Sequence, residues 1–324
     1  MTRRPATRAT GTVLRRGARG LRAAVLAWVV WRLLGPEVPR RYSRPQEVPL
    51  RFTGHTVLVG HREFFVREAG PEGAPPLVLV HGWSLDGLMT FYKIIPELAE
   101  RFHVIVPDLR DHGRSDWVRG RYDIPDLADE LAGTLRAIGV RDATVLGYSL
   151  GGMVVQELAH RHRDVIGHMV LGATGAYPVP RLRHPTRLVF WVLRILARIS
   201  TTEGAWLTTR ILLRTGSLLP EHEQWMYEAL KRRDPSLFYE AGDAAWRFDS
   251  RSWLPSVRVP ATIVVPTGDT LVTLAAQREL ASLLPDAEVV ELPGVGHESI
   301  LSRSDDYVKL LIRIVESRRT EIGS

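Results

Sequence analysis

A short segment around Ser149 constrains the fold of this chain more than any other. Residues 143–146 form an apolar run typical of a buried strand, and the residues after 150 have the pattern of a helix. Ser149 lies between them, with Gly147 and Gly151 two residues to either side. A strand that reverses sharply into a helix leaves no room for side chains at those two positions and holds the serine in a strained conformation. The pattern therefore predicts a nucleophile elbow; the alternative is an ordinary serine in a glycine-bearing turn.

Apolar runs alternate with helix-length segments along most of the chain. An antiparallel pair is expected at residues 56–60 and 63–68, before the alternation begins. Further strands are expected at residues 77–80, 104–106, 168–171, 261–265 and 288–292, and helices at 88–101, 124–138, 273–284 and 305–318. Strands separated by helices form right-handed crossovers in a mostly parallel sheet. The sequence therefore predicts an α/β fold with the Ser149 strand inside the sheet.

The alternation stops after residue 175, and no convincing strand follows until residue 261. Helical patterns occur instead at residues 186–199, 204–214, 221–232 and 236–247. The first of them is apolar over a very wide arc. The segment is either a helical insertion that packs on the sheet or a cap that lines an apolar substrate channel. We therefore divide the chain into a leader (1–49), a core (50–174 and 252–324) and a helical cap (175–251).

The positive charge of the chain is confined to its leader. The formal net charge is +7, yet residues 1–51 carry 12 arginines, no lysine and two glutamates, so the remainder has a net charge of −3. This distribution argues against a nucleic-acid partner for the body. Cysteine is absent, which excludes disulfides and thiolate metal sites. The sequence shows no metal-ligand cluster and no phosphate-binding loop, so we expect no cofactor; it predicts no oligomeric state.

The leader combines an arginine-rich stretch with an apolar helix, residues 21–34, that ends at Gly35-Pro36. A positive segment before an apolar run resembles a signal peptide, but no cleavage site follows. Fourteen helical residues span about 21 Å, which is short of the ~30 Å hydrocarbon core of a bilayer. We expect residues 1–34 to bind an anionic membrane surface, at the cytoplasmic face. The alternatives are an uncleaved segment that anchors the protein in the membrane and a helix that packs on the body.

The partners of Ser149 can be selected by elimination. In elbow enzymes the acid and then the histidine follow the serine along the chain. Of the six histidines after Ser149, only His297 lies in a glycine-flanked loop beyond a late strand. Asp269 follows the strand at 261–265, at the sheet edge where open α/β folds keep their sites. We therefore expect Ser149, Asp269 and His297 to form a triad; the alternative for Asp269 is the N-cap of the next helix.

With these motifs the chain resembles the α/β-hydrolase superfamily over residues 50–320. Ser149, Asp269 and His297 match the nucleophile, acid and base of that family. His81-Gly82-Trp83 matches its His-Gly segment after the third strand, and residues 108–115 resemble its D-x-x-G-x-G-x-S segment. Asp111-His112 stand where the family usually has Gly-His or Gly-Tyr.

The resemblance implies a serine hydrolase of carboxylic esters, thioesters or lactones with a hydrophobic acyl or bulky apolar group. The backbone N–H groups of Leu150 and Trp83 would form the oxyanion hole. His81 and Gly82, like Gly147 and Gly151, would have structural roles at the site. Hydrolysis of C–C bonds and perhydrolase or haloperoxidase chemistry use the same triad and remain alternatives. A further alternative, from another class, is a binding protein of this fold without catalysis.

Overall fold

The computed structural model describes residues 20–21, 23–31, 42, 44–118, 120, 122–177, 201–284 and 286–323. Eight strands in this part of the chain form one sheet in the order β1-β2-β4-β3-β5-β6-β7-β8. They are β1 (Gly54–Val59), β2 (Arg62–Ala69), β3 (Pro76–Val80), β4 (His103–Pro107), β5 (Ala143–Tyr148), β6 (Ile166–Gly172), β7 (Ala261–Pro266) and β8 (Glu288–Leu292). Strand β2 is antiparallel to β1 and β4, and all other neighbouring strands are parallel. The predicted mostly parallel sheet is confirmed.

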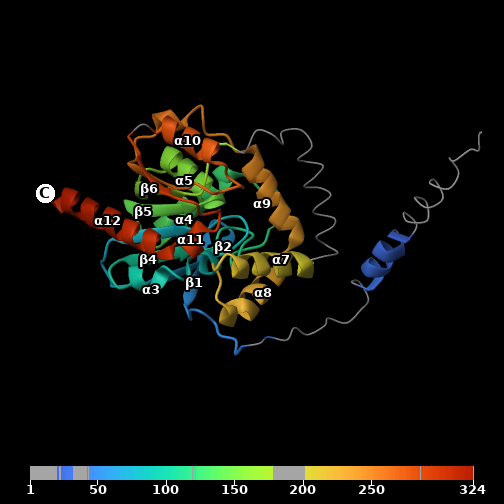
Figure 1. The fold of residues 1–324 in the computed structure, drawn as a ribbon. Coiled ribbons are helices and arrows are strands. Elements are labelled where there is room, and N and C mark those ends of the chain that lie inside the picture. The colour runs from blue at the N-terminus through green and yellow to red at the C-terminus, as the bar shows by residue number, and fades with distance from the viewer. Residues whose placement is uncertain are drawn as a thin grey trace, which may run out of the picture.

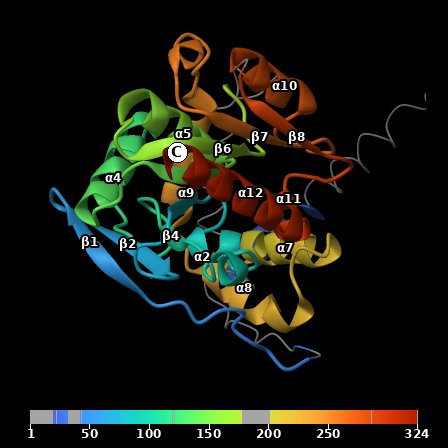
Figure 2. The same ribbon diagram turned by 90° about the vertical axis from the view of Figure 1, so that its left-hand side faces the viewer.

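Helices cover both faces of this sheet (Figures 1 and 2). Side chains alternate between the faces along a strand, so Val78 and Val80 of β3 join one core and Leu77 and Leu79 the other. The first core is completed by α4 (Ile124–Ala137), α5 (Leu150–Arg161) and α10 (Leu274–Leu283). The second is completed by α2 (Gly87–Phe91), α3 (Ile95–Leu98), α11 (Ser299–Ser302) and α12 (Ser304–Gly323). The loops at the strand ends are therefore held by a sheet that is packed on both sides.

The helix predicted at residues 88–101 is two short helices, and that prediction was wrong. The first, α2, begins after Asp86, whose carboxylate accepts a hydrogen bond from Met89 N at 2.8 Å. The second, α3, begins one residue before Pro96. Proline has no N–H group to continue the i→i−4 hydrogen bonds of a helix and is tolerated only in a first turn. The apolar pattern continues through this break because both helices pack on the same core.

The insertion between β6 and β7 is helical where the structure describes it. Its helices are α7 (Thr201–Arg214), α8 (Glu223–Lys231) and α9 (Pro235–Arg247), grouped beside the sheet in Figure 1. Ala241 and Phe248 contribute to the core on the α5 side, and Met226 and Leu230 to the core on the α12 side. The helix predicted at residues 186–199 lies outside the described residues. The described part of the insertion is therefore packed on both cores of the sheet.

Part of the leader is described as well. Residues 20–21 and 23–31 are helical, and Leu26, Trp28 and Trp31 are 65%, 39% and 48% exposed. Across the described ranges, no helix is both long enough and apolar enough to cross a membrane. The leader helix therefore presents apolar side chains to its surroundings over a short length.

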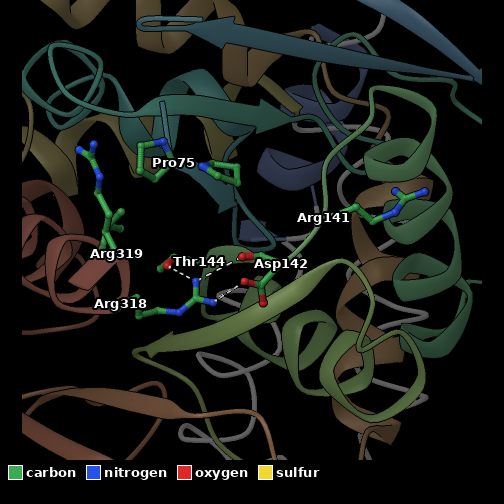
Figure 3. A pocket seen from close by; sticks show the side chains of 8 residues that line it. Pro75, Arg141, Asp142, Thr144, Arg318 and Arg319 are labelled. Carbon is green, nitrogen blue, oxygen red and sulfur yellow. Dashed lines mark hydrogen bonds and ion pairs between the residues drawn. The ribbon is translucent and has the colours of Figure 1, made fainter. Parts of the chain in front are cut away.

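A hollow at the amino ends of β3 and β5 lies at the sheet edge opposite the loop of Ser149 (Figure 3). Arg318 of α12 donates hydrogen bonds there to Asp142 Oδ2 at 3.0 Å and to Thr144 Oγ1 at 3.1 Å. A Cβ atom on Gly167 would lie 1.9 Å from the Arg318 guanidinium, so a larger residue there would displace the side chains of this ion pair. Arg141 points away from the other side chains in Figure 3. We interpret the hollow as a structural contact, in which hydrogen bonds from Arg318 hold α12 against the sheet.

Candidate active site

Four loops with polar residues meet at the carboxyl edge of the sheet. Ser149 follows β5, Asp269 follows β7, His297 follows β8, and the segment 81–83 follows β3. These strands are neighbours in the order β3-β5-β6-β7-β8 and are parallel. Because parallel strands end at the same edge, side chains that are far apart in the sequence come together there.

The turn at Ser149 has the strained geometry that the glycine pattern predicts. Ser149 has φ 55° and ψ −118°, a conformation rarely adopted by residues other than glycine. A Cβ atom on Gly147 would lie 2.5 Å from the Gly151 carbonyl oxygen, and one on Gly151 would lie 2.3 Å from the Val80 carbonyl oxygen. Both glycines are therefore required by close backbone packing, which holds the serine at the tip of the turn.

The three polar side chains form a hydrogen-bonded chain. His297 Nε2 lies 2.9 Å from Ser149 Oγ, and His297 Nδ1 lies 2.7 Å from Asp269 Oδ2. Since the carboxylate can only accept, Nδ1 carries the proton and Nε2 is left to accept from the serine hydroxyl. The structure thus brings together the three residues that the sequence selected, in the arrangement of a nucleophile, a base and an orienting acid.

The Asp269 carboxylate is fixed by backbone donors of its own loop. Its side chain is fully buried, and Oδ1 accepts hydrogen bonds from Leu271 N at 2.8 Å and Val272 N at 2.9 Å. The N-cap of α10 is Thr273, which accepts from Ala276 N. Asp269 is therefore not the N-cap of the following helix, and its second oxygen is directed at His297.

Tyr148 is a residue of the site that the sequence did not single out. Its hydroxyl donates a hydrogen bond to the His297 carbonyl oxygen and lies 3.1 Å from Ser299 Oγ. Its ring centroid lies 5.9 Å from that of His297, and burial raises the pKa of the phenol well above its usual value, so it remains a donor. Tyr148 occupies a variable position of the G-x-S-x-G pattern, where no periodicity or spacing marks a tyrosine. Its hydrogen bonds help to hold the His297 loop in place.

The loop after β3 lies directly against the serine. A Cβ atom on Gly82 would come within 3.2 Å of Ser149 Cβ. The Leu150 N–H belongs to the first residue of α5, and N–H groups of a first helical turn have no intrahelical acceptor. The first N–H group of α5 and the loop at Gly82 therefore both lie beside Ser149.

His81 fixes the orientation of one peptide group in this loop. Its Nε2 accepts from Leu109 N at 2.9 Å, so Nδ1 carries the proton and donates to the Gly82 carbonyl at 2.8 Å. Burial lowers the pKa of His81 to about 4, which keeps the ring neutral. The Gly82 carbonyl and the Trp83 N–H belong to the same planar trans peptide and point in opposite directions. Holding the carbonyl therefore also holds the direction of the Trp83 N–H.

The segment after β4 supports this loop. The Asp108 carboxylate is buried and accepts from Arg67 Nη1 at 3.0 Å and from the backbone N–H groups of Gly87 and Arg114. Asp111 has φ 62°, which lies in the left-handed region that glycine adopts most readily. Aspartate tolerates this conformation better than most residues, and Asp111 Oδ1 accepts from Val118 N at 2.7 Å. The departure from the family pattern is therefore accommodated locally.

An apolar cavity opens beside the Ser149 hydroxyl. Core residues and residues of the insertion line it, among them Trp83, Leu150, Met153, Tyr177, Trp246 and Leu271. The Tyr177 hydroxyl donates a hydrogen bond to Glu279 Oε2 at 2.6 Å. Within the described ranges, no group of three or more histidine, aspartate or glutamate side chains is arranged to hold a metal ion. The lining of the cavity next to the serine is therefore mostly apolar.

This sheet, with its serine turn at the carboxyl edge, is the α/β-hydrolase fold. Residues 77–310 match the model of the family described as "Alpha/beta hydrolase family". The chain belongs to this family, and it is a hydrolase.

Similar proteins cover most of the chain. A pimeloyl-[acyl-carrier protein] methyl ester esterase of Chromobacterium violaceum is 30% identical over 250 residues, which are 75% of this chain and 95% of that protein. A magnesium-chelatase 30 kDa subunit of Rhodobacter capsulatus is 29% identical over 273 residues, 78% of this chain and 91% of that protein. The solved structure of an enol-lactonase from Burkholderia xenovorans LB400 has a TM-score of 0.70 and 25% identity, and covers 81% of this chain and 100% of that one. Their names differ in the activity that they state, so the substrate has to be argued from the site.

Proposed function

We propose that the protein hydrolyses a carboxylic ester, thioester or lactone, with Ser149, His297 and Asp269 as its catalytic residues. The observation that carries this proposal is the chain of hydrogen bonds from Ser149 Oγ through His297 to the buried Asp269, at 2.9 Å and 2.7 Å. Both distances are within hydrogen-bond reach, which supports the roles of an activated nucleophile and an oriented base. Similarity to proteins named as an esterase and an enol-lactonase supports an ester-type substrate.

The geometry suggests a two-step reaction. Ser149 Oγ attacks the acyl carbon while His297 Nε2 takes its proton, and Asp269 stabilises the imidazolium. The oxyanion accepts hydrogen bonds from the N–H groups of Leu150 and Trp83. When the tetrahedral intermediate collapses, the C–O bond to the leaving alcohol breaks, or in a thioester the C–S bond to the leaving thiol. The leaving group takes the proton from Nε2. A water molecule then attacks the acyl-enzyme with the same base, which releases the acid and restores the serine hydroxyl.

We further propose that the insertion, residues 175–251, is a cap that selects a hydrophobic substrate. Tyr177 and Trp246 of the insertion and Met153 of the core all line the cavity beside Ser149. A substrate in this cavity is therefore enclosed by both parts of the chain, and its acyl or other apolar group replaces water against aromatic and aliphatic side chains.

Medium-length acyl chains should be preferred over acetyl in a panel of p-nitrophenyl esters. Each buried methylene contributes about 0.8 kcal/mol, so two additional methylenes should raise kcat/KM about tenfold. Trp246→Ala should alter this dependence on chain length, whereas Trp206→Ala, on an exposed side chain of α7, should not. A steady fall in kcat/KM from acetyl to octanoyl would show that the helices of the insertion serve for packing only.

For the leader we propose contact with an anionic membrane surface. Arg15, Arg16 and Arg19 precede the apolar segment 21–34 and Arg22 is its second residue, and each basic residue near an anionic leaflet contributes about 1 kcal/mol. The exposed Trp28 and Trp31 suit the headgroup region. The apolar stretch is shorter than a bilayer core, so the helix would lie in the surface plane.

A protein that begins at Arg44 should keep its esterase activity and lose its binding to anionic liposomes. Cosedimentation with phosphatidylglycerol vesicles at low salt measures this, with phosphatidylcholine vesicles as the control. Binding of the full chain should also weaken as the salt concentration rises. Equal binding of the full and the shortened protein to anionic vesicles would contradict a role of the leader at membranes.

A further inference from the structure

The loop that contributes the proposed oxyanion donor is held by the insertion as well as by the core. We propose that Arg233, in the turn between α8 and α9, is a positioning residue for the oxyanion hole. This inference rests on the proposed function and adds to it a role of the insertion in catalysis itself.

Arg233 connects the two parts of the protein through hydrogen bonds to backbone oxygens. Its Nη1 donates to the Ser84 carbonyl oxygen, one residue beyond Trp83. Its Nε donates to the Leu230 carbonyl at 3.2 Å, in the last turn of α8. The guanidinium is planar and its N–H groups point in fixed directions. The two hydrogen bonds together therefore constrain the distance between α8 and the loop.

Three consecutive carbonyl groups of this loop each lie within hydrogen-bond distance of a side-chain nitrogen. Gly82 O accepts from His81, Trp83 O lies 2.8 Å from His112 Nε2, and Ser84 O accepts from Arg233. Strand β3 ends at Val80, so these peptides lie beyond the sheet ladder that would otherwise orient them. The peptide that carries the Trp83 N–H is the first of the three. Arg233, which belongs to the insertion, contacts the third.

The charge of a neighbouring residue also favours the position of Arg233 beside this loop. Asp86 attracts the guanidinium and also caps α2 at the end of the loop, through Met89 N at 2.8 Å. Burial, and then the neighbouring Asp108, raise the pKa of Asp86 to about 6, and Arg233 acts against that rise. Burial lowers the pKa of Arg233 to about 10, so it stays charged at neutral pH. The Arg233 guanidinium thus donates a hydrogen bond to the loop at Ser84 and is attracted electrostatically to Asp86.

A second contact from the insertion reaches the same loop. The ring of Tyr239 on α9 meets the ring of Trp83 edge-on, with centroids 6.4 Å apart. A shift of α8 and α9 would therefore move both the Trp83 side chain and the Ser84 carbonyl group. The position of the insertion and the direction of the Trp83 N–H are coupled through these contacts.

The test compares three variants with the wild type on p-nitrophenyl acetate, whose small acyl group makes little use of the cavity. Arg233→Met keeps the length of the side chain and removes its donors, and Arg233→Lys restores one charged donor. Arg232→Met is the matched control, because Arg232 is exposed and its Nε donates to Glu228 O of α8. Loss of one oxyanion donor costs about 10²–10³ in kcat, so loss of its support should cost at least about tenfold.

We expect Arg233→Met to lower kcat with KM within about twofold of the wild type, Arg233→Lys to recover part of the loss, and Arg232→Met to match the wild type. A trifluoromethyl ketone, whose serine adduct places an oxyanion in the hole, should bind Arg233→Met more weakly by the factor lost in kcat/KM. If Arg233→Met does not fold, as judged by thermal unfolding, Arg233→Lys must still show the joint loss in kcat and in ketone binding.

Wild-type kcat in both Arg233 variants, or a loss confined to KM with ketone binding unchanged, would overturn the inference and leave the hydrolase intact. A wild type that neither hydrolyses esters nor binds the ketone would overturn the proposed function and this inference together.

Discussion

Ser149→Ala should abolish ester turnover while the protein remains folded. Removal of the nucleophile from such a triad lowers kcat by roughly 10⁴–10⁶, because no other group can accept the acyl chain. Ser149 Oγ makes its hydrogen bond to His297, and the backbone of the turn is held by Gly147 and Gly151 rather than by the hydroxyl. The melting temperature should therefore stay within a few degrees of the wild-type value.

Steady-state hydrolysis of a p-nitrophenyl ester measures the loss. Ser217→Ala is a suitable control, because Ser217 is a buried serine near α7, remote in sequence from the turn and absent from the cavity lining. Near-normal kcat in Ser149→Ala would assign the nucleophile to another residue.

Asp269→Asn should lower kcat at neutral pH by about 10⁴, the cost of the wrong histidine tautomer. Leu271 N and Val272 N both donate to Oδ1, so an asparagine would keep its oxygen there and direct its NH₂ group at His297. Nδ1 of His297 would then have to accept, and its proton would move to Nε2, which could no longer accept from Ser149. The replacement leaves the shape of the site unchanged and reverses the direction of one hydrogen bond.

The effect should appear in kcat more than in KM, since the substrate does not contact Asp269. Asp249→Asn is the matched control, because its exposed carboxylate pairs with Arg251 away from the triad. If Asp269→Asn retained near-normal kcat, another carboxylate would have to orient His297.

The sequence was informative where a pattern repeats along the chain. Buried strands such as β3 and β5 are continuous apolar runs because both faces of the sheet are covered, and this reveals the order of strands and helices. Ser149 and Asp269 each follow such a run, and His297 follows β8, a parallel strand with two glutamates at the end of the sheet, so topology brings the three residues to one edge. The order of the triad along the chain then leaves few candidates.

Other features depend on contacts that leave no pattern. Tyr148, His112 and Arg233 act through backbone carbonyls of segments far away in the sequence, and a carbonyl is present at every residue. The break between α2 and α3 could have been predicted from Pro96, but the apolar pattern on either side outweighed it. The positive φ of Asp111 explains a motif residue that the sequence could only mark as unusual.

The central claim, that Ser149 is an activated nucleophile oriented by His297 and Asp269, can be tested most directly by covalent labelling. A fluorophosphonate reacts much faster with a serine whose proton a neighbouring base removes than with an ordinary side chain, and peptide mass spectrometry identifies the modified residue. We predict stoichiometric labelling of the wild type at Ser149, with none in Ser149→Ala and strongly slowed labelling in His297→Ala. Labelling at any other residue, or an unmodified wild-type protein, would contradict the assignment.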